Sequence, residues 1–186
     1  MDRAELKALE QILAEMPIAP APSPWRKVTI SAVGGLLAVG FGPGSDLLLV
    51  VSSQGRGVLD CRSVARVARN RTNALDELDE QQLVAFGIGP LDGVLVSMAG
   101  LPGGGLPTGS GDGWSVEVET LRWPERYIFL VEPWQSLYQL PPRATKIATD
   151  GACTFRAAGF SPTGQSLVVA TSCDVSIWAR TPGETA

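Results

Sequence analysis

The stretch AVGFGPGSDLLLVVSSQGRGVLDCR (residues 38–62) aligns without a gap to AAGFSPTGQSLVVATSCDVSIWART (residues 157–181). Ala, Gly, Phe, Pro, Leu, Val and Ser coincide at matched positions of the two copies. Each copy has a strand ending in Phe41 or Phe160, a turn with Pro and Gly, a run of Leu and Val, and a third short strand. One such unit cannot cover both faces of its own sheet, so the repeat predicts units that stack on one another.

Two weaker copies lie between the long ones. Residues 87–97 repeat the order of glycine, proline and apolar run, and residues 122–131 repeat it more faintly. The chain after residue 24 therefore has room for about four strand units of the size found in propeller blades. We expect an all-β fold of blade-like antiparallel repeats, preceded by a short N-terminal helix.

The long copies resemble blades of the WD-repeat β-propeller family. Residues 159–178, GFSPTGQSLVVATSCDVSIW, have the family's phenylalanine, serine-proline turn, apolar strand, Ser-x-Asp turn and terminal aromatic residue. The family's Gly-His dipeptide is absent, because the chain contains no histidine. Three architectures are consistent with this repeat: a small propeller of about four units, an open array of blades completed by a second copy, or a β-sandwich.

The N-terminal segment differs from the repeats. Residues 1–24 are predicted to form an amphipathic helix over 2–16, capped by Asp2, and a proline-rich strap, while residues 25–186 form a single β domain. The helix either packs on its own domain or docks on another subunit. Residues 73–84 are expected to form a short helix or an ordered loop between strands.

The distribution of charge argues against a nucleic-acid partner. The formal net charge is −4, and the basic stretch formed by Arg62, Arg66, Arg69 and Arg71 is followed at once by acidic residues at 76–80. We interpret this basic stretch as a solvated strand edge next to an acidic helix.

Cysteine usage predicts a reducing compartment. Cys61, Cys153 and Cys173 are odd in number and have no CxxC spacing, so neither a disulfide framework nor a zinc site is expected. Acidic residues near the N-terminus replace the positive charge of a secretion signal, and no apolar run is long enough to span a bilayer. These features predict a cytoplasmic protein without a membrane segment.

The absence of histidine excludes Ser-His-Asp and Cys-His mechanisms. The glycine-rich residues 100–113 lack the Lys-Ser/Thr ending of a phosphate-binding loop and are interpreted as a connection. We therefore predict no catalytic residue, no metal site and no cofactor. An enzyme or small-ligand binder that uses carboxylates in a propeller-type channel remains the competing class.

Residues 100–138 are the predicted partner-binding region, because a long loop is followed by amphipathic aromatic side chains. The alternative is that these aromatic residues fill the core. The expected function is non-catalytic protein binding or scaffolding, with an immunity or antitoxin-like neutraliser of a basic toxin as an alternative. Self-association through the N-terminal helix or open blade edges is a further expectation. The candidate residues are Asp112, Trp114, Arg122, Trp123, Arg126, Trp134 and Tyr138.

Overall fold

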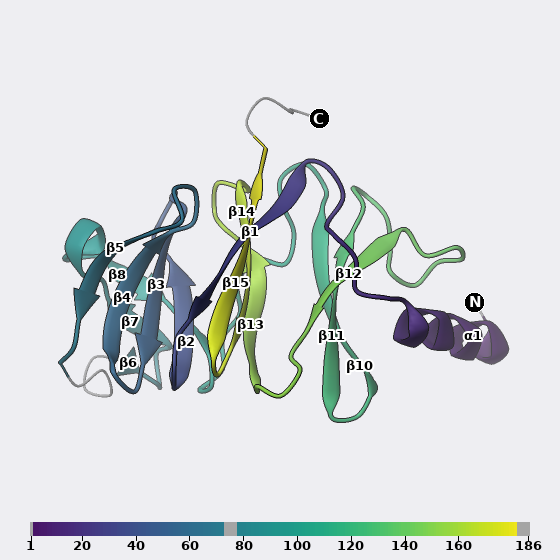
Figure 1. Cartoon of the computed structure of the whole chain (residues 1–186), viewed down its shortest axis with the longest axis horizontal. Helices are drawn as coiled ribbons and strands as arrows, with labels where there is room; N and C mark the ends of the chain where they lie inside the picture. Colours follow the sequence, from purple (N-terminus) through teal and green to yellow (C-terminus); the bar gives the residue numbers. More distant parts are fainter. Residues whose placement is uncertain (1, 73–77, 182–186) are drawn as a thin grey trace.

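Four antiparallel sheets and one α-helix make up residues 2–72 and 78–181, the part of the chain described by this computed structural model (Figure 1). One sheet has the order β5-β4-β3-β2-β9, with β2 (Leu36–Phe41), β3 (Leu47–Ser52), β4 (Gly55–Asp60), β5 (Ala65–Asn70) and β9 (Ala99–Gly100). Another has the order β1-β15-β14-β13, with β1 (Trp25–Ala32), β13 (Phe155–Phe160), β14 (Ser166–Thr171) and β15 (Asp174–Arg180). The smaller sheets contain β6 (Leu78–Asp79), β7 (Val84–Phe86) and β8 (Leu95–Ser97), and β10 (Ser115–Arg122), β11 (Glu125–Val131) and β12 (Ala144–Thr149). The helices are α1 (Arg3–Glu15) and the short 3-10 helix η1 (Gly89–Leu91).

The two long copies of the repeat fold in the same way. Strands β2, β3 and β4 of the first copy correspond to β13, β14 and β15 of the second. Phe41 pairs with Leu48 as Phe160 pairs with Leu167, and both hairpins have a register shift near the start of the first strand. The repeat therefore specifies the backbone path and the strand register, as the sequence predicts.

The sheets stack face to face in an open row. The order along the row is β6–β8, β2–β5, β13–β15 with β1, β10–β12, and finally α1 (Figure 1). An apolar cluster fills each space between neighbours, and the central one joins the two repeat copies. Its members are Leu36, Val39, Phe41, Leu48, Val50, Leu59, Cys61, Ala99, Leu106, Ala157, Val168, Ala170, Val175 and Ile177.

This arrangement confirms an all-β fold with a short N-terminal helix. The described strands form four separate antiparallel sheets, none of them closed, and this establishes neither a propeller nor a sandwich.

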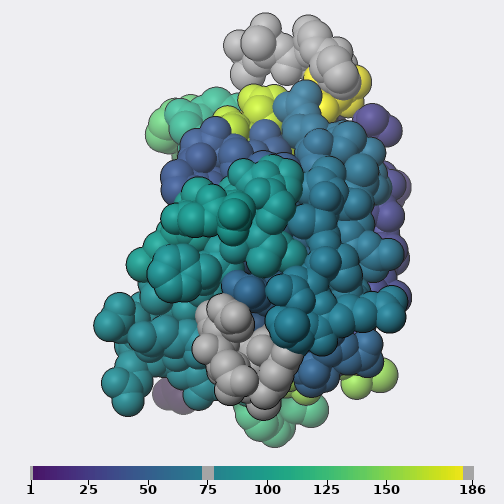
Figure 2. Space-filling view, turned by 90° about the vertical axis from the view of Figure 1, so that its left-hand side faces the viewer, coloured from purple at the N-terminus to yellow at the C-terminus, as the bar shows by residue number. Residues whose placement is uncertain are grey.

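The two ends of the row of sheets differ in how they are covered. At one end, Leu9 and Leu13 of α1 are fully buried against β11. Figure 2 views the opposite end, where residues of β7 and β8 are coloured teal. Phe86 and Leu95 form a cross-strand pair there and are exposed.

Helix α1 is fixed at both of its own ends. Asp2 accepts hydrogen bonds from the first-turn amides in a capping box with Glu5. At the other end the buried Lys146 of β12 donates to the Ala14 carbonyl at 2.9 Å, with its ammonium 4.4 Å from the Tyr127 ring centroid. Because α1 has no basic residue in its last turn, this lysine supplies the positive charge that favours a helix C-terminus. The helix thus packs on its own domain.

Matched glycines allow a second segment to approach each repeat closely. A Cβ on Gly40 would lie 2.2 Å from the Ser97 carbonyl oxygen, and one on Gly159 would lie 2.7 Å from the Pro107 carbonyl oxygen. The Phe160 amide donates to that Pro107 oxygen at 2.7 Å. The 101–113 connection is therefore ordered along the inner edge of β13 instead of forming a free loop.

The interpretation of residues 73–84 is corrected where the structure describes them. Residues 73–77 lie outside the described part of the chain. From residue 78 onward the chain forms the β6–β7 hairpin, not a helix. The Asp79 carboxylate accepts from the Gln81 and Gln82 amides, which closes the turn and competes with helical hydrogen bonding.

The prediction that no disulfide forms is wrong. Cys153 is bonded to Cys173, with Cα atoms 6.0 Å apart, and Cys61 is a buried free thiol. The register that pairs Phe155 with Thr171 places the two bonded cysteines opposite each other just beyond β13 and β14. Strand pairing, rather than cysteine spacing, determines this bond. Among the described residues, no helix is long and apolar enough to cross a membrane.

Replacing Cys153 and Cys173 by serine is expected to lower the free energy of unfolding by about 3 kcal/mol, because the bond closes a loop with a sequence separation of 20. Urea denaturation with and without reductant measures the loss. The variant itself is the control, since reductant should not change its midpoint. Thiol titration of the unfolded, unreduced protein should find Cys61 alone; three thiols would contradict the bond.

Candidate partner-binding surface

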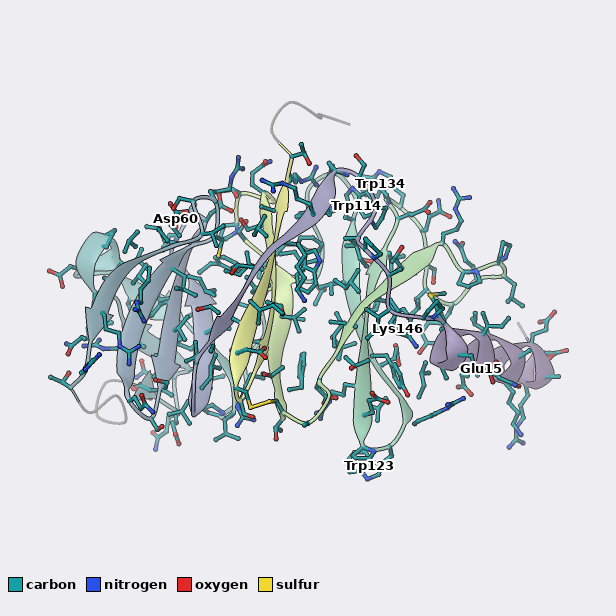
Figure 3. All side chains as sticks on the ribbon, viewed as in Figure 1. Glu15, Asp60, Trp114, Trp123, Trp134 and Lys146 are labelled. Atoms are coloured by element: carbon teal, nitrogen blue, oxygen red, sulfur yellow. A yellow bond between two sulfur atoms is a disulfide. The ribbon has the colours of Figure 1, made fainter. Side chains whose placement is uncertain are left out.

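The seven predicted site residues do not form one surface. Trp114 and Trp134 lie at one end of the β10–β12 sheet, and Trp123 lies at the opposite end (Figure 3). Tyr138 lies in a third environment, near acidic residues of α1 and β10.

Asp112 is a structural anchor for the 101–113 connection. Both of its carboxylate oxygens accept from Arg180 Nη2 at 2.7 Å, and Ser110 Oγ donates to it at 2.7 Å. Burial opposes ionisation of Asp112, but the hydrogen bonds from Arg180 and Ser110 outweigh this effect and lower the carboxyl pKa. Arg180 also lies 4.6 Å from the Trp25 ring centroid, so this network links the connection to β15 and β1.

The structure places Trp114 in the core, so its proposed contact with a partner is corrected. Its side chain is only 5% exposed and packs edge-on against Trp25, with ring centroids 6.4 Å apart. Burying a large aromatic side chain stabilises the fold. The Trp25 and Trp114 rings both pack in the apolar cluster between β10–β12 and β13–β15.

Trp134 is exposed but covers part of its own chain. The side chain is 78% exposed, and a Cβ on Gly113 would meet the indole at 2.5 Å. The Trp134 amide donates to the Gly113 carbonyl at 3.0 Å, and Trp134 has φ of 61°, which is unusual for a bulky residue. Trp134 is therefore held over the end of the 101–113 connection.

Tyr138 lies beside a group of carboxylates. Burial, together with Glu119 and the more distant charges of Glu10 and Glu117, raises the pKa of Tyr138 to about 12. Burial and the neighbouring Glu119 also raise the pKa of Glu117. Like charges are thus kept close together on this side of α1 and β10, at a cost in stability.

Trp123 occupies the most open position among the candidates. It lies at the β10–β11 turn, 83% exposed, next to a surface hollow. Arg122 precedes it and reaches Glu15 of α1 only at 3.8 Å between two exposed side chains, which contributes little to stability. The hollow is lined by Trp123, Pro124, Glu125, Arg126, Asp150, Gly151, Ala152, Cys153 and Thr154.

The walls of this hollow are held in place before any partner arrives. Asp150 accepts from the Arg126 amide at 3.0 Å and lies 3.7 Å from the Arg126 guanidinium. That guanidinium stacks 5.5 Å from the Phe155 ring centroid. The disulfide attaches Cys153 to the β14–β15 turn. Of the candidates, the structure therefore brings Trp123 and Arg126 together at this hollow, whereas Arg122 reaches towards α1.

Changing Asp112 to Asn is expected to lower the free energy of unfolding by about 1 to 2 kcal/mol at pH 7, because the partly solvent-screened pair with Arg180 is lost. The folded pKa lies below the unfolded value, so this stabilisation is present above about pH 3.9 and is lost as pH falls through the folded pKa. Denaturation at pH 7 and pH 3 should show the difference from wild type shrinking in acid. The control is Asp92→Asn, since the exposed Asp92 side chain has no hydrogen bond or ion pair with the described residues; an equal effect at both pH values would contradict the role of the carboxylate.

Within residues 2–72 and 78–181, no group of three or more Cys, Asp or Glu side chains is arranged to hold a metal ion. Comparison with known proteins finds no matching family model and no matching curated protein.

Proposed function

We propose that the protein is a non-catalytic binding module that holds a partner protein at the Trp123 hollow. The observation that supports this most is an indole 83% exposed at a turn, beside a hollow with fixed walls. Tryptophan and arginine are the residue types that most often dominate binding energy at protein interfaces. Walls fixed in advance reduce the entropy lost on association.

The proposed occupant is a protein segment with an apolar side chain that packs on the indole. The rim includes the polar residues Thr154 and Glu125, and the Glu125 carboxylate also accepts a hydrogen bond from the Tyr127 hydroxyl at 2.8 Å. An apolar centre with a polar rim is the usual composition of a protein interface. The chain has no histidine to act as a general base, which supports binding over catalysis.

Trp123→Ala should raise the Kd for the partner about tenfold or more, because the indole would be the central buried contact of the interface. The partner is captured from cells of the source organism on immobilised protein, and its Kd is then measured by calorimetry. Trp134→Ala is the matched control: its indole is 78% exposed but lies at the other end of the sheet (Figure 3). Equal losses in the two variants, or no loss in Trp123→Ala, would contradict the proposal.

Neutralisation of a basic protein is the second candidate function. The carboxylates of Glu10, Glu117 and Glu119 around Tyr138 favour it, because a basic partner would relieve their mutual repulsion. If this second function is correct, the double variant Glu117→Gln with Glu119→Gln would raise the Kd for the captured partner in the same measurement, and Trp123→Ala would leave it unchanged.

The predicted cytoplasmic location remains a proposal. The Cys153–Cys173 bond counts against a reducing compartment, because such bonds persist mainly in oxidising ones.

A further inference from the structure

A second candidate site lies between the outer edge strands of the two central sheets. β1 is the edge of one sheet and β5 the edge of its neighbour. Two adjoining hollows separate them and share four lining residues, Ser31, Ala32, Leu59 and Arg66. We call these two hollows the β1–β5 groove.

A bulge in β5 directs two arginines into this groove. Arg66 pairs with Leu59 and Arg69 pairs with Gly57, whereas Val67 has no partner in β4. Residues three apart in a regular strand point to opposite faces, but the extra residue places both arginines on the face of Leu59 and Gly57. Both arginines line the groove, and Gly57 adds no side chain to its floor.

The electrostatic character of the groove is opposite to that of the whole protein. The chain has 19 acidic residues and a net charge of −4, yet among residues 2–72 and 78–181 no carboxylate lines either hollow. Arg66 and Arg69 form no ion pair with any residue in the described part of the chain. Clustered guanidinium groups without carboxylate partners favour an anionic ligand.

We propose that the β1–β5 groove binds an extended acidic segment of a partner protein. Alternate side chains of an extended segment are about 7 Å apart and point the same way, so acidic residues at alternate positions would face Arg66 and Arg69 together. The outward backbone groups of β1 and β5 offer hydrogen-bond partners along both sides. This site is separate from the Trp123 hollow, with which it shares no lining residue.

Protection of a strand edge is the alternative role of these arginines, and the peptide measurement below separates it from binding. Arginines and bulges also keep edge strands from pairing with other chains, and charged side chains at an edge serve that purpose whether they point inward or outward. Arg66 and Arg69 are exposed, and they line the groove beside the buried apolar side chains of Leu59 and Val50. Nucleic acid is disfavoured as the ligand, because the overall negative charge repels a phosphate backbone.

The test is fluorescence anisotropy with a short labelled peptide of alternating Glu and Thr, compared with the same peptide carrying Gln for Glu. The wild type should bind the Glu peptide in the micromolar to millimolar range and at least about tenfold more tightly than the Gln peptide. Arg66→Glu with Arg69→Glu should reduce binding at least about tenfold. The matched control is Arg3→Glu with Lys7→Glu, which changes the net charge equally on exposed positions of α1 and should bind like the wild type.

Circular dichroism and thermal melting establish that both double variants are folded before binding is compared. The proposal is overturned if the wild type binds both peptides equally or not at all, if the two double variants lose affinity equally, or if a single-stranded oligonucleotide binds more tightly than the Glu peptide. None of these results would change the expected effect of Trp123→Ala at the separate hollow.

Discussion

The packing of one repeat copy against the other is the interaction on which the rest of the structure depends. Each copy buries one face of its three-stranded meander in the central cluster, and each uses the opposite face to carry a smaller sheet. β1 then pairs with β15 along its length, so that the N-terminal part of the body completes the sheet formed by the C-terminal part. This pairing closes the chain on itself without closing the row of sheets into a ring.

The open row also explains where binding surfaces are available. In a closed ring the sheets would cover one another's faces and the turns would gather at the two rims. Here the β10–β11 turn carries Trp123 at its tip (Figure 3), and the hollows lined by β1 and β5 form a groove between two neighbouring sheets. The 101–113 connection follows the inner edges of the sheets, anchored through Asp112 and Arg180. Both proposed binding sites therefore lie at a turn or at outer sheet edges.

Sequence predicted those features that depend on local pattern. The repeat predicts strand bounds and register because the matched Leu, Val and Phe residues are buried and paired in the same way in both sheets, although the two copies pack them in different clusters. Features created by tertiary pairing were not predictable in the same way. The Cys153–Cys173 bond follows from the register of β13 on β14, which the sequence spacing of the cysteines does not reveal. Trp114 is buried partly against Trp25 of β1, a residue far from it in the sequence. Arg66 and Arg69 were recognised as a strand edge, but their common orientation comes from a bulge that leaves no mark in the sequence.

Hydrogen exchange of the variant Val168→Ala tests the shared core most directly. Val168 of β14 is fully buried in the central cluster, so its truncation should destabilise both repeat copies. The account predicts that amides of β2, β3 and β4 lose the same amount of protection as those of β14 and β15. A loss confined to β13–β15, with unchanged protection in β2–β4, would show that the copies do not stabilise each other and would contradict the account.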